Sequence, residues 1–188
     1  TDTFILTIRP NHHRHGIPAN DTFNPRLNIA YYPNDDSMVY FEAAKGFRSG
    51  SISSTSIMTA SNATLGGTNY DNASEPDTLW NYTLGGKWDL GSVQIDLAAF
   101  FYDWGDAQIE ISPALQTIVI PIGDIEGRGI DLTIAWDTPI DGLSLYFSGN
   151  TNEVELDNVD DAIQVKNPFM ANGSQLPGTA KTTYSIRS

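Results

Sequence analysis

Three histidines lie close together near the start of the chain, at His12, His13 and His15. Imidazole nitrogens bind metals and carry protons near neutral pH, so this cluster is the first candidate for chemistry. No further ligating side chain follows at the spacing of a metal site. We therefore interpret the cluster as part of a solvated loop without a metal, and keep a contact between His13 and a small-molecule ligand as a hypothesis.

A second cluster is acidic and lies between residues 153 and 161. Its carboxylates could supply the oxygen ligands that Ca²⁺ prefers. The spacing lacks the glycine and the terminal glutamate of an EF-hand, so we expect a hydrated loop and no metal site. The residues are Glu153, Glu155, Asp157, Asp160 and Asp161.

No residue pattern in the sequence indicates a catalytic site. The chain has no cysteine, which removes thiol nucleophiles and disulfides. It has no Gly-x-Ser-x-Gly segment, and its three histidines share one predicted loop, so a Ser-His-Asp arrangement is unsupported. We expect no catalytic residue, no cofactor and no enzymatic activity.

The composition favours an all-β protein and excludes one class of partner. Ten Lys and Arg against 23 Asp and Glu give a formal net charge of -13. Because phosphate recognition needs clustered basic side chains, we expect no nucleic-acid partner. Sixteen Gly, ten Pro and many β-branched and aromatic residues favour turns and strands over helices.

Alternation of apolar and polar residues is the main structural signal. In residues 129–137, Ile130 and Ile134 fall on one face of a strand and Asp131 and Thr133 on the other. Similar patterns predict about eight antiparallel strands, most near the ~9–11 residues that a tilted strand needs to cross a membrane. Their approximate ranges are 4–9, 26–32, 38–46, 80–89, 92–104, 129–137, 143–150 and 178–187.

The apolar residues of these strands are expected to face lipid and the polar ones the lumen of a barrel. Phe100 is the one misfit in its strand, since it is apolar at a position where the alternation predicts a polar residue. We interpret Lys45 as marking the membrane boundary, because a lysine near a strand end can snorkel toward the headgroups. The predicted lumen-facing residues are Arg26, Asn28, Glu42, Asn81, Lys87, Asp96 and Asp131.

The predicted connections alternate in length. Short turns at 33–37, 89–92 and 138–142 would lie on one side, and long loops at 10–24, 47–77, 105–123 and 157–177 on the other. This asymmetry is typical of outer-membrane barrels. Aromatic residues are expected to form two interfacial girdles: Tyr31, Tyr32, Trp88 and Trp136 beside the turns, and Phe47, Trp80, Phe101, Tyr102 and Trp104 toward the loops.

An ordered series of motifs resembles the barrel of TonB-dependent receptors. Residues 45–50, Lys-Gly-Phe-Arg-Ser-Gly, resemble the family's Gly-Phe-Arg-x-Gly segment, and residues 75–87 resemble a strand start that reads Pro-Glu-x-x-x-x-Tyr-Glu-x-Gly-x-Lys. Residues 100–104, 125–131 and 173–181 match later parts of the barrel in order and spacing. The series departs from the usual pattern at Asp77 and Thr83, where glutamate is commoner.

The resemblance implies a function in ligand uptake across the bacterial outer membrane. Residues 1–188 would form a partial barrel domain, truncated at both ends and without the plug domain, as part of a larger barrel. By resemblance the partners would be a plug and the TonB complex outside this chain, a siderophore-like or other scarce small ligand, and outer-membrane lipid with lipopolysaccharide. Ligand contacts are expected at His13, Arg48 and Tyr70.

Two other architectures remain open at this point. One is a complete small barrel of eight strands that anchors or adheres without transport. The other is a soluble β-sandwich that binds carbohydrate, which would bury the apolar strand faces against a second sheet.

Overall fold

Eight antiparallel strands form one sheet in the computed structural model, which describes residues 3–13, 22–112, 117–166 and 168–188. Each strand pairs with its neighbour in the chain, so the strand order is β1 to β8, which confirms the predicted all-β fold. The strands are β1 (Thr3–His13), β2 (Thr22–Asn34), β3 (Ser37–Arg48), β4 (Asp77–Asp89), β5 (Val93–Ile111), β6 (Ile118–Asp137), β7 (Ser144–Asp157) and β8 (Thr182–Arg187).

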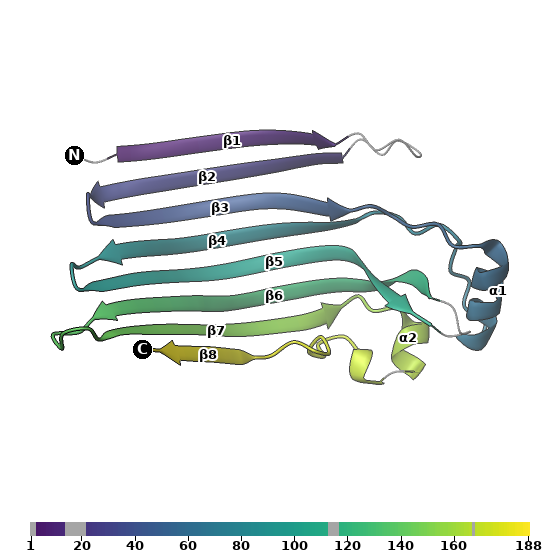
Figure 1. The fold of residues 1–188 in the computed structure, drawn as a ribbon. Helices are drawn as coiled ribbons and strands as arrows, with labels where there is room; N and C mark the ends of the chain where they lie inside the picture. The colour runs from purple at the N-terminus through teal and green to yellow at the C-terminus, as the bar shows by residue number, and fades with distance from the viewer. Residues whose placement is uncertain (1–2, 14–21, 113–116, 167) are drawn as a thin grey trace.

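Connections of different length lie at opposite ends of the sheet (Figure 1). The three short turns lie at the end where β1 begins and β8 ends, and the long connections at the other, as the sequence predicts. The long connections carry α1 (Thr55–Thr64), α2 (Asp161–Lys166) and the 3-10 turn η1 (Pro168–Met170).

None of the described helices is long and apolar enough to cross a membrane.

The register gives the sheet two chemically different faces. Asp96 pairs with both Lys87 and Thr133, and side chains two residues apart along each strand share this polar face. On the opposite, apolar face, Ile95 pairs with Ile134 and Leu97 with Leu132. Large apolar side chains on this second face, such as Ile130, are exposed in the described chain.

Aromatic rings on the polar face lie over glycines of the neighbouring strand. A Cβ added at Gly127 would come 2.0 Å from Cζ of Tyr102, and one added at Gly129 would come 2.5 Å from Cζ of Phe100. Such pairs fill the space above a glycine and fix the register of the strands. Phe100 is therefore no misfit, because its ring covers Gly129 on the polar face and stacks with Tyr102 at 6.3 Å.

The loop end of the sheet has its own apolar core, which the sequence reading missed. The predicted loop at 105–123 is wrong, because β5 and β6 continue as a long hairpin past an irregular step. Asp106 (φ 54°) and Gly123 (φ 124°) mark that step. Side chains from α1, β5, β6, β7 and the segment through α2 pack there: Met58, Ala107, Ile118, Ile120, Ile122, Ile125, Val154, Leu156, Val159 and Ile163.

Three further expectations are corrected by the strand boundaries and register. The acidic segment is mainly strand, because β7 runs to Asp157, and His12 and His13 belong to β1 rather than to a loop. His15 lies outside the described residues. Of the nine predicted girdle residues, Tyr32, Tyr102 and Trp104 share the polar face and belong to no lipid-facing girdle.

The sheet is open in the described residues, and both rival architectures fail. A complete eight-stranded barrel would pair β1 with β8, whereas the described pairings join only successive strands. A sandwich needs a second sheet packed on the first, and the described strands form a single sheet.

Candidate functional site

The polar face brings together all seven residues that the sequence predicts to face a lumen. Arg26 donates to Glu42 across 2.7 Å, and the amide of Asn28 lies beside both side chains. Asn81 and Asp131 lie on the same face, further along the sheet. Because these groups come from β2, β3, β4 and β6, the face is continuous across the sheet.

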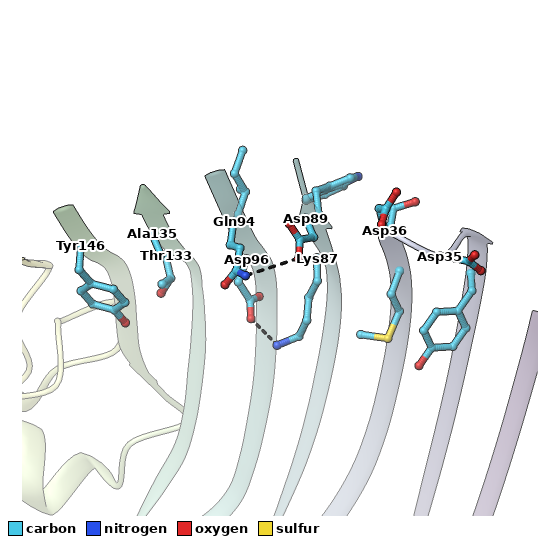
Figure 2. A pocket seen from close by; sticks show the side chains of 14 residues that line it. Asp35, Asp36, Lys87, Asp89, Gln94, Asp96, Thr133, Ala135 and Tyr146 are labelled. Carbon is cyan, nitrogen blue, oxygen red and sulfur yellow. Dashed lines mark hydrogen bonds and ion pairs between the residues drawn. The ribbon is translucent and has the colours of Figure 1, made fainter. Parts of the chain in front are cut away.

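The remaining two of the seven, Lys87 and Asp96, form an ion pair between β4 and β5. They line a hollow of about 450 Å³ close to the short turns. Figure 2 shows its lining side chains spread over neighbouring strands, from Asp35 at one end to Tyr146 at the other. Its charged and hydroxyl groups can hydrogen-bond to a polypeptide or to water.

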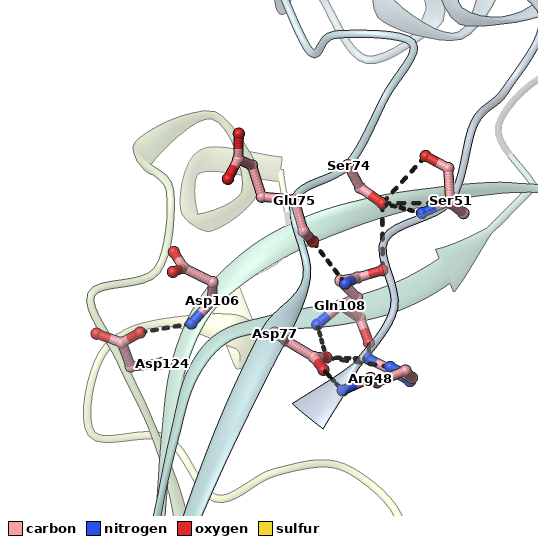
Figure 3. Close-up of polar contacts among 8 residues, drawn as sticks. All are labelled: Arg48, Ser51, Ser74, Glu75, Asp77, Asp106, Gln108 and Asp124. Atoms are coloured by element: carbon pink, nitrogen blue, oxygen red, sulfur yellow. Dashed lines mark hydrogen bonds and ion pairs between the residues drawn. The ribbon is translucent and has the colours of Figure 1, made fainter. Parts of the chain in front are cut away.

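A second polar site ties the long β3–β4 connection to the sheet (Figure 3). Asp77, which is 2% exposed, accepts hydrogen bonds from backbone N and Nε of Arg48 at 3.2 and 3.1 Å. It also accepts one from Nη2 of Arg48 at 2.5 Å and one from backbone N of Gln108 at 3.2 Å. Nη2 of Arg48 donates to the carbonyl oxygen of Gln108 as well, at 2.6 Å. One buried carboxylate therefore joins β3, β4 and β5.

The same network extends into the connection itself. The side chain of Gln108 donates to the carbonyl oxygen of Glu75 at 2.7 Å and accepts from the hydroxyl of Ser74 at 3.2 Å. The backbone N–H of Ser51 donates to the hydroxyl of Ser74 at 2.8 Å, and this bond holds the two sides of the connection together. Both ends of the α1-bearing connection are thus fixed to the β5–β6 hairpin.

Arg48 lies at the base of this connection and has three partners. Besides the contacts to Asp77 and Gln108, its guanidinium lies 5.3 Å from the ring centroid of Trp104, within cation–π range. Its side chain is 51% exposed, so one side of the guanidinium still meets solvent. The arrangement orders the loop base.

The other two predicted ligand contacts lie elsewhere. Tyr70 is half-buried and packs against the core at the loop end, beside Asn62, whose side-chain amide donates to its carbonyl oxygen at 2.9 Å. Burial, and then the nearby carboxylate of Asp160, raise the pKa of Tyr70 above its usual value. His13 ends β1, two strands away from Arg48 in β3. The structure therefore does not bring the three together in the described residues.

Sequence reasoning missed Gln108, Ser74 and Asp124. Gln108 lay in a predicted loop, although Ile109 and Ile111 around Glu110 gave a short alternating signal. Asp124 accepts from backbone N of Asp106 at 3.0 Å and braces the step in the hairpin. In the part of the chain that the structure describes, no group of three or more His, Cys, Asp or Glu could hold a metal ion.

Comparisons with known proteins agree with this geometry. The family described as "TonB dependent receptor-like, beta-barrel" matches residues 3–188. No curated protein matches the chain.

Several solved structures share the fold. The ferric yersiniabactin uptake receptor of Yersinia pestis is similar with a TM-score of 0.65 at 20% identity, over 89% of this chain and 22% of that one. The ferric preacinetobactin receptor of Acinetobacter baumannii is similar with a TM-score of 0.65 at 17% identity, over 98% of this chain and 26% of that one. The ferric-catecholate import receptor of E. coli K12 is similar with a TM-score of 0.62 at 14% identity, over 89% of this chain and 22% of that one. The chain thus spans about a quarter of the length of these structures.

Proposed function

This chain belongs to the TonB-dependent receptor β-barrel family, and from that premise we propose that it forms part of the wall of a receptor that imports a scarce small ligand across the bacterial outer membrane. Proteins of this family are transporters rather than enzymes. The ligand we propose is siderophore-like, since the structural neighbours named above are receptors for iron complexes.

The observation that carries this proposal is the division of one open sheet into a polar and an exposed apolar face. On β6 the apolar face stays apolar from Trp136 to Ile130 and becomes charged at Arg128. Between Ile130 and Trp136 the strand rises about 20 Å, or about 15 Å along the axis of a barrel with ordinary strand tilt, which fits within the ~25 Å apolar band of such barrels. An exposed apolar surface of this height favours lipid as its solvent.

The polar face supports a lumen that holds water and a plug domain. Its ion pairs, Arg26 with Glu42 and Lys87 with Asp96, are half-exposed in this chain and would face the plug in the whole receptor. The hollow beside Lys87 offers both charge signs to a docking polypeptide. In this arrangement the ligand binds loops and plug, and energised TonB pulls on the plug so that the ligand passes inward.

The long connections would lie on the extracellular side, where the ligand arrives. The firm attachment of the β3–β4 connection through Asp77 and Arg48 supports a preorganised loop base. His13, Arg48 and Tyr70 stand as proposed ligand contacts, and the exposed side of the Arg48 guanidinium is the best placed to meet an anionic group.

Uptake by cells tests this proposal. A strain lacking the full-length receptor and one complemented with it receive ferric complexes of catecholate, hydroxamate and phenolate siderophores under iron limitation. We expect iron uptake from at least one complex to depend on the receptor and to disappear in a matched strain without TonB.

Uptake that is unchanged in the deletion strain for every ferric complex would remove the siderophore assignment. Receptor found in a water-soluble fraction rather than in the outer membrane would overturn the proposed function as a whole.

A further inference from the structure

The three short turns form one surface at the end of the sheet opposite the long connections (Figure 1). Backbone hydrogen bonds join successive turns: the N–H of Asp89 donates to the carbonyl oxygen of Asp36 at 2.7 Å, and the N–H of Asp137 donates to that of Ser92 at 2.8 Å. Because adjacent strands lie ~4.8 Å apart, the three turns extend over about 20 Å. We call this continuous surface the turn rim, and it comprises residues 33–37, 89–92 and 137–143.

Side-chain hydrogen bonds fix the shape of each turn. The carboxylate of Asp89 accepts from the backbone N–H of Gly91 at 2.9 Å, and the hydroxyl of Thr138 accepts from that of Ile140 at 3.2 Å. The side-chain oxygen of Asn34 caps the first turn in the same way at 3.0 Å. A surface that is already ordered loses little conformational freedom when a partner docks on it.

The charge of the turn rim has one sign. Its three segments hold five aspartates and no lysine or arginine. All five are exposed, and among the described residues none of them forms an ion pair. Figure 2 shows three of them, Asp35, Asp36 and Asp89, at the ends of their strands. The negative field of such a surface attracts a cationic partner and repels an anion.

Two aliphatic side chains stand out of this acidic surface. Leu90 and Ile140 are each 65% exposed, in the second and third turns. Hydrocarbon is a poor solvent for them, because the adjoining Asp89 and Asp141 would have to enter it as well. Apolar anchors surrounded by polar groups are typical of an interface with another protein. The turn rim therefore suits a protein with a basic face.

The chemistry of the proposed ligand indicates which protein this is. In the proposed receptor the short turns face the periplasm, where the ligand leaves the barrel. Iron complexes with catecholate or phenolate oxygens carry a net negative charge. A soluble protein that receives such a complex needs cationic side chains around its binding site. This basic mouth is attracted to the turn rim, whereas the free complex is repelled from it.

We propose that the turn rim docks the soluble periplasmic protein that takes over the ferric complex. The basic mouth of that protein lies on the aspartates, and Leu90 and Ile140 are buried at the contact. The inference rests on the proposed function, because the partner is periplasmic and basic only if the receptor imports an anionic iron complex.

Surface plasmon resonance on the full-length receptor in lipid nanodiscs tests the docking. The probe is the purified periplasmic ferric-siderophore-binding protein of the same organism. Three carboxylates that cap no turn are neutralised together, in Asp35→Asn, Asp36→Asn, Asp141→Asn. We expect this triple variant to bind the probe about tenfold more weakly, mainly through slower association.

The matched control carries the same charge change at the loop end, in Asp71→Asn, Glu110→Gln, Asp161→Asn. It should stay within about twofold of wild type, because these exposed acids lie at the opposite end of the sheet. Leu90→Ser and Ile140→Ser should each weaken binding about fivefold, since each removes apolar area that docking buries.

The charge state of the probe gives a further readout. A bound ferric complex neutralises part of the basic mouth, so the loaded probe should bind about threefold more weakly than the empty one. Tighter binding of the loaded probe would overturn the inference. Equal losses in the rim variant and the loop-end control would overturn it too, and so would a rim variant that weakens binding of the periplasmic domain of TonB but not of the probe.

The transport assay separates the two proposals. A receptor that imports a ferric complex, but whose rim variant binds the probe as wild type does, refutes only the docking surface. A rim-dependent complex with a receptor that imports no ferric complex refutes only the proposed function.

Discussion

Asp77→Asn tests the polar site that anchors the β3–β4 connection. The substitution keeps the size of the side chain but replaces an acceptor oxygen with an N–H₂ group beside Arg48 and the backbone N–H of Gln108. Gln108 is 5% exposed, so water cannot readily replace the lost partner of its N–H. The half-exposed guanidinium of Arg48 can hydrate, which lowers its share of the loss.

The cost is therefore set mainly by one or two buried donors that lose their acceptor, at ~1–3 kcal/mol each. We take about 2–3 kcal/mol as the loss in local stability of the connection, less than the ~3–5 kcal/mol for breaking a fully buried ion pair. If the connection opens locally, this corresponds to amide exchange about 30- to 150-fold faster in residues 49–76.

Hydrogen–deuterium exchange of the full-length receptor measures this directly. Asp71→Asn is the matched control, because Asp71 is an exposed acid in the same connection, and it should change exchange less than twofold. If Asp77→Asn accelerates exchange no more than Asp71→Asn does, Asp77 does not anchor the connection. Equal acceleration in the turn at 138–142 would also contradict this role, since the effect would then be global.

Two further predictions concern packing and ionisation. Gly127→Ala places a Cβ 2.0 Å from the Tyr102 ring and should lower the free energy of unfolding in micelles by about 1–3 kcal/mol. Gly46→Ala is the control and should change the free energy of unfolding little, because no atom lies within 4 Å of the added Cβ. Equal effects of the two substitutions would contradict the packing of the Tyr102 ring over Gly127. The folded-state pKa of Tyr70 is raised, so the folded state favours the neutral phenol. The stability that this neutral side chain gives the fold is complete below the ordinary tyrosine pKa of about 10 and is lost as pH rises beyond it. The tyrosinate absorbance difference between wild type and Tyr70→Phe should accordingly have its midpoint above pH 10, and a midpoint at or below 10 would contradict the burial.

The membrane-spanning part of the fold could be predicted because its signal is local. In β6, Ile130 to Trp136 alternate with Asp131 and Thr133, and a register error of one residue would exchange the two faces. That alternation placed all seven predicted polar residues on one face of the sheet. It could not explain Phe100, because the glycine that its ring covers lies on the next strand.

The loop end could not be predicted from periodicity. Gly105, Asp106 and Gly123 interrupt the alternation, so the continuation of β5 and β6 read as a loop. Helix α1 is rich in Thr, Ser and Asn, which are weak helix formers, and its position depends on tertiary packing of Met58 against the core. The Arg48–Asp77–Gln108 network joins residues up to 60 positions apart, a separation that no local pattern encodes.

We propose that this sheet forms a barrel wall with lipid on one side and the lumen on the other. Spin labels at single cysteines test it on β6, and this chain contributes no native cysteine to interfere. In the full-length receptor in liposomes, we expect labels at Ile130, Leu132 and Ile134 to be accessible to lipid-soluble oxygen. Labels at Asp131 and Thr133 should be shielded from oxygen and show higher accessibility to a water-soluble relaxation agent. Accessibility without this period of two, or water exposure on both faces, would contradict a barrel wall with one lipid face and one lumen face.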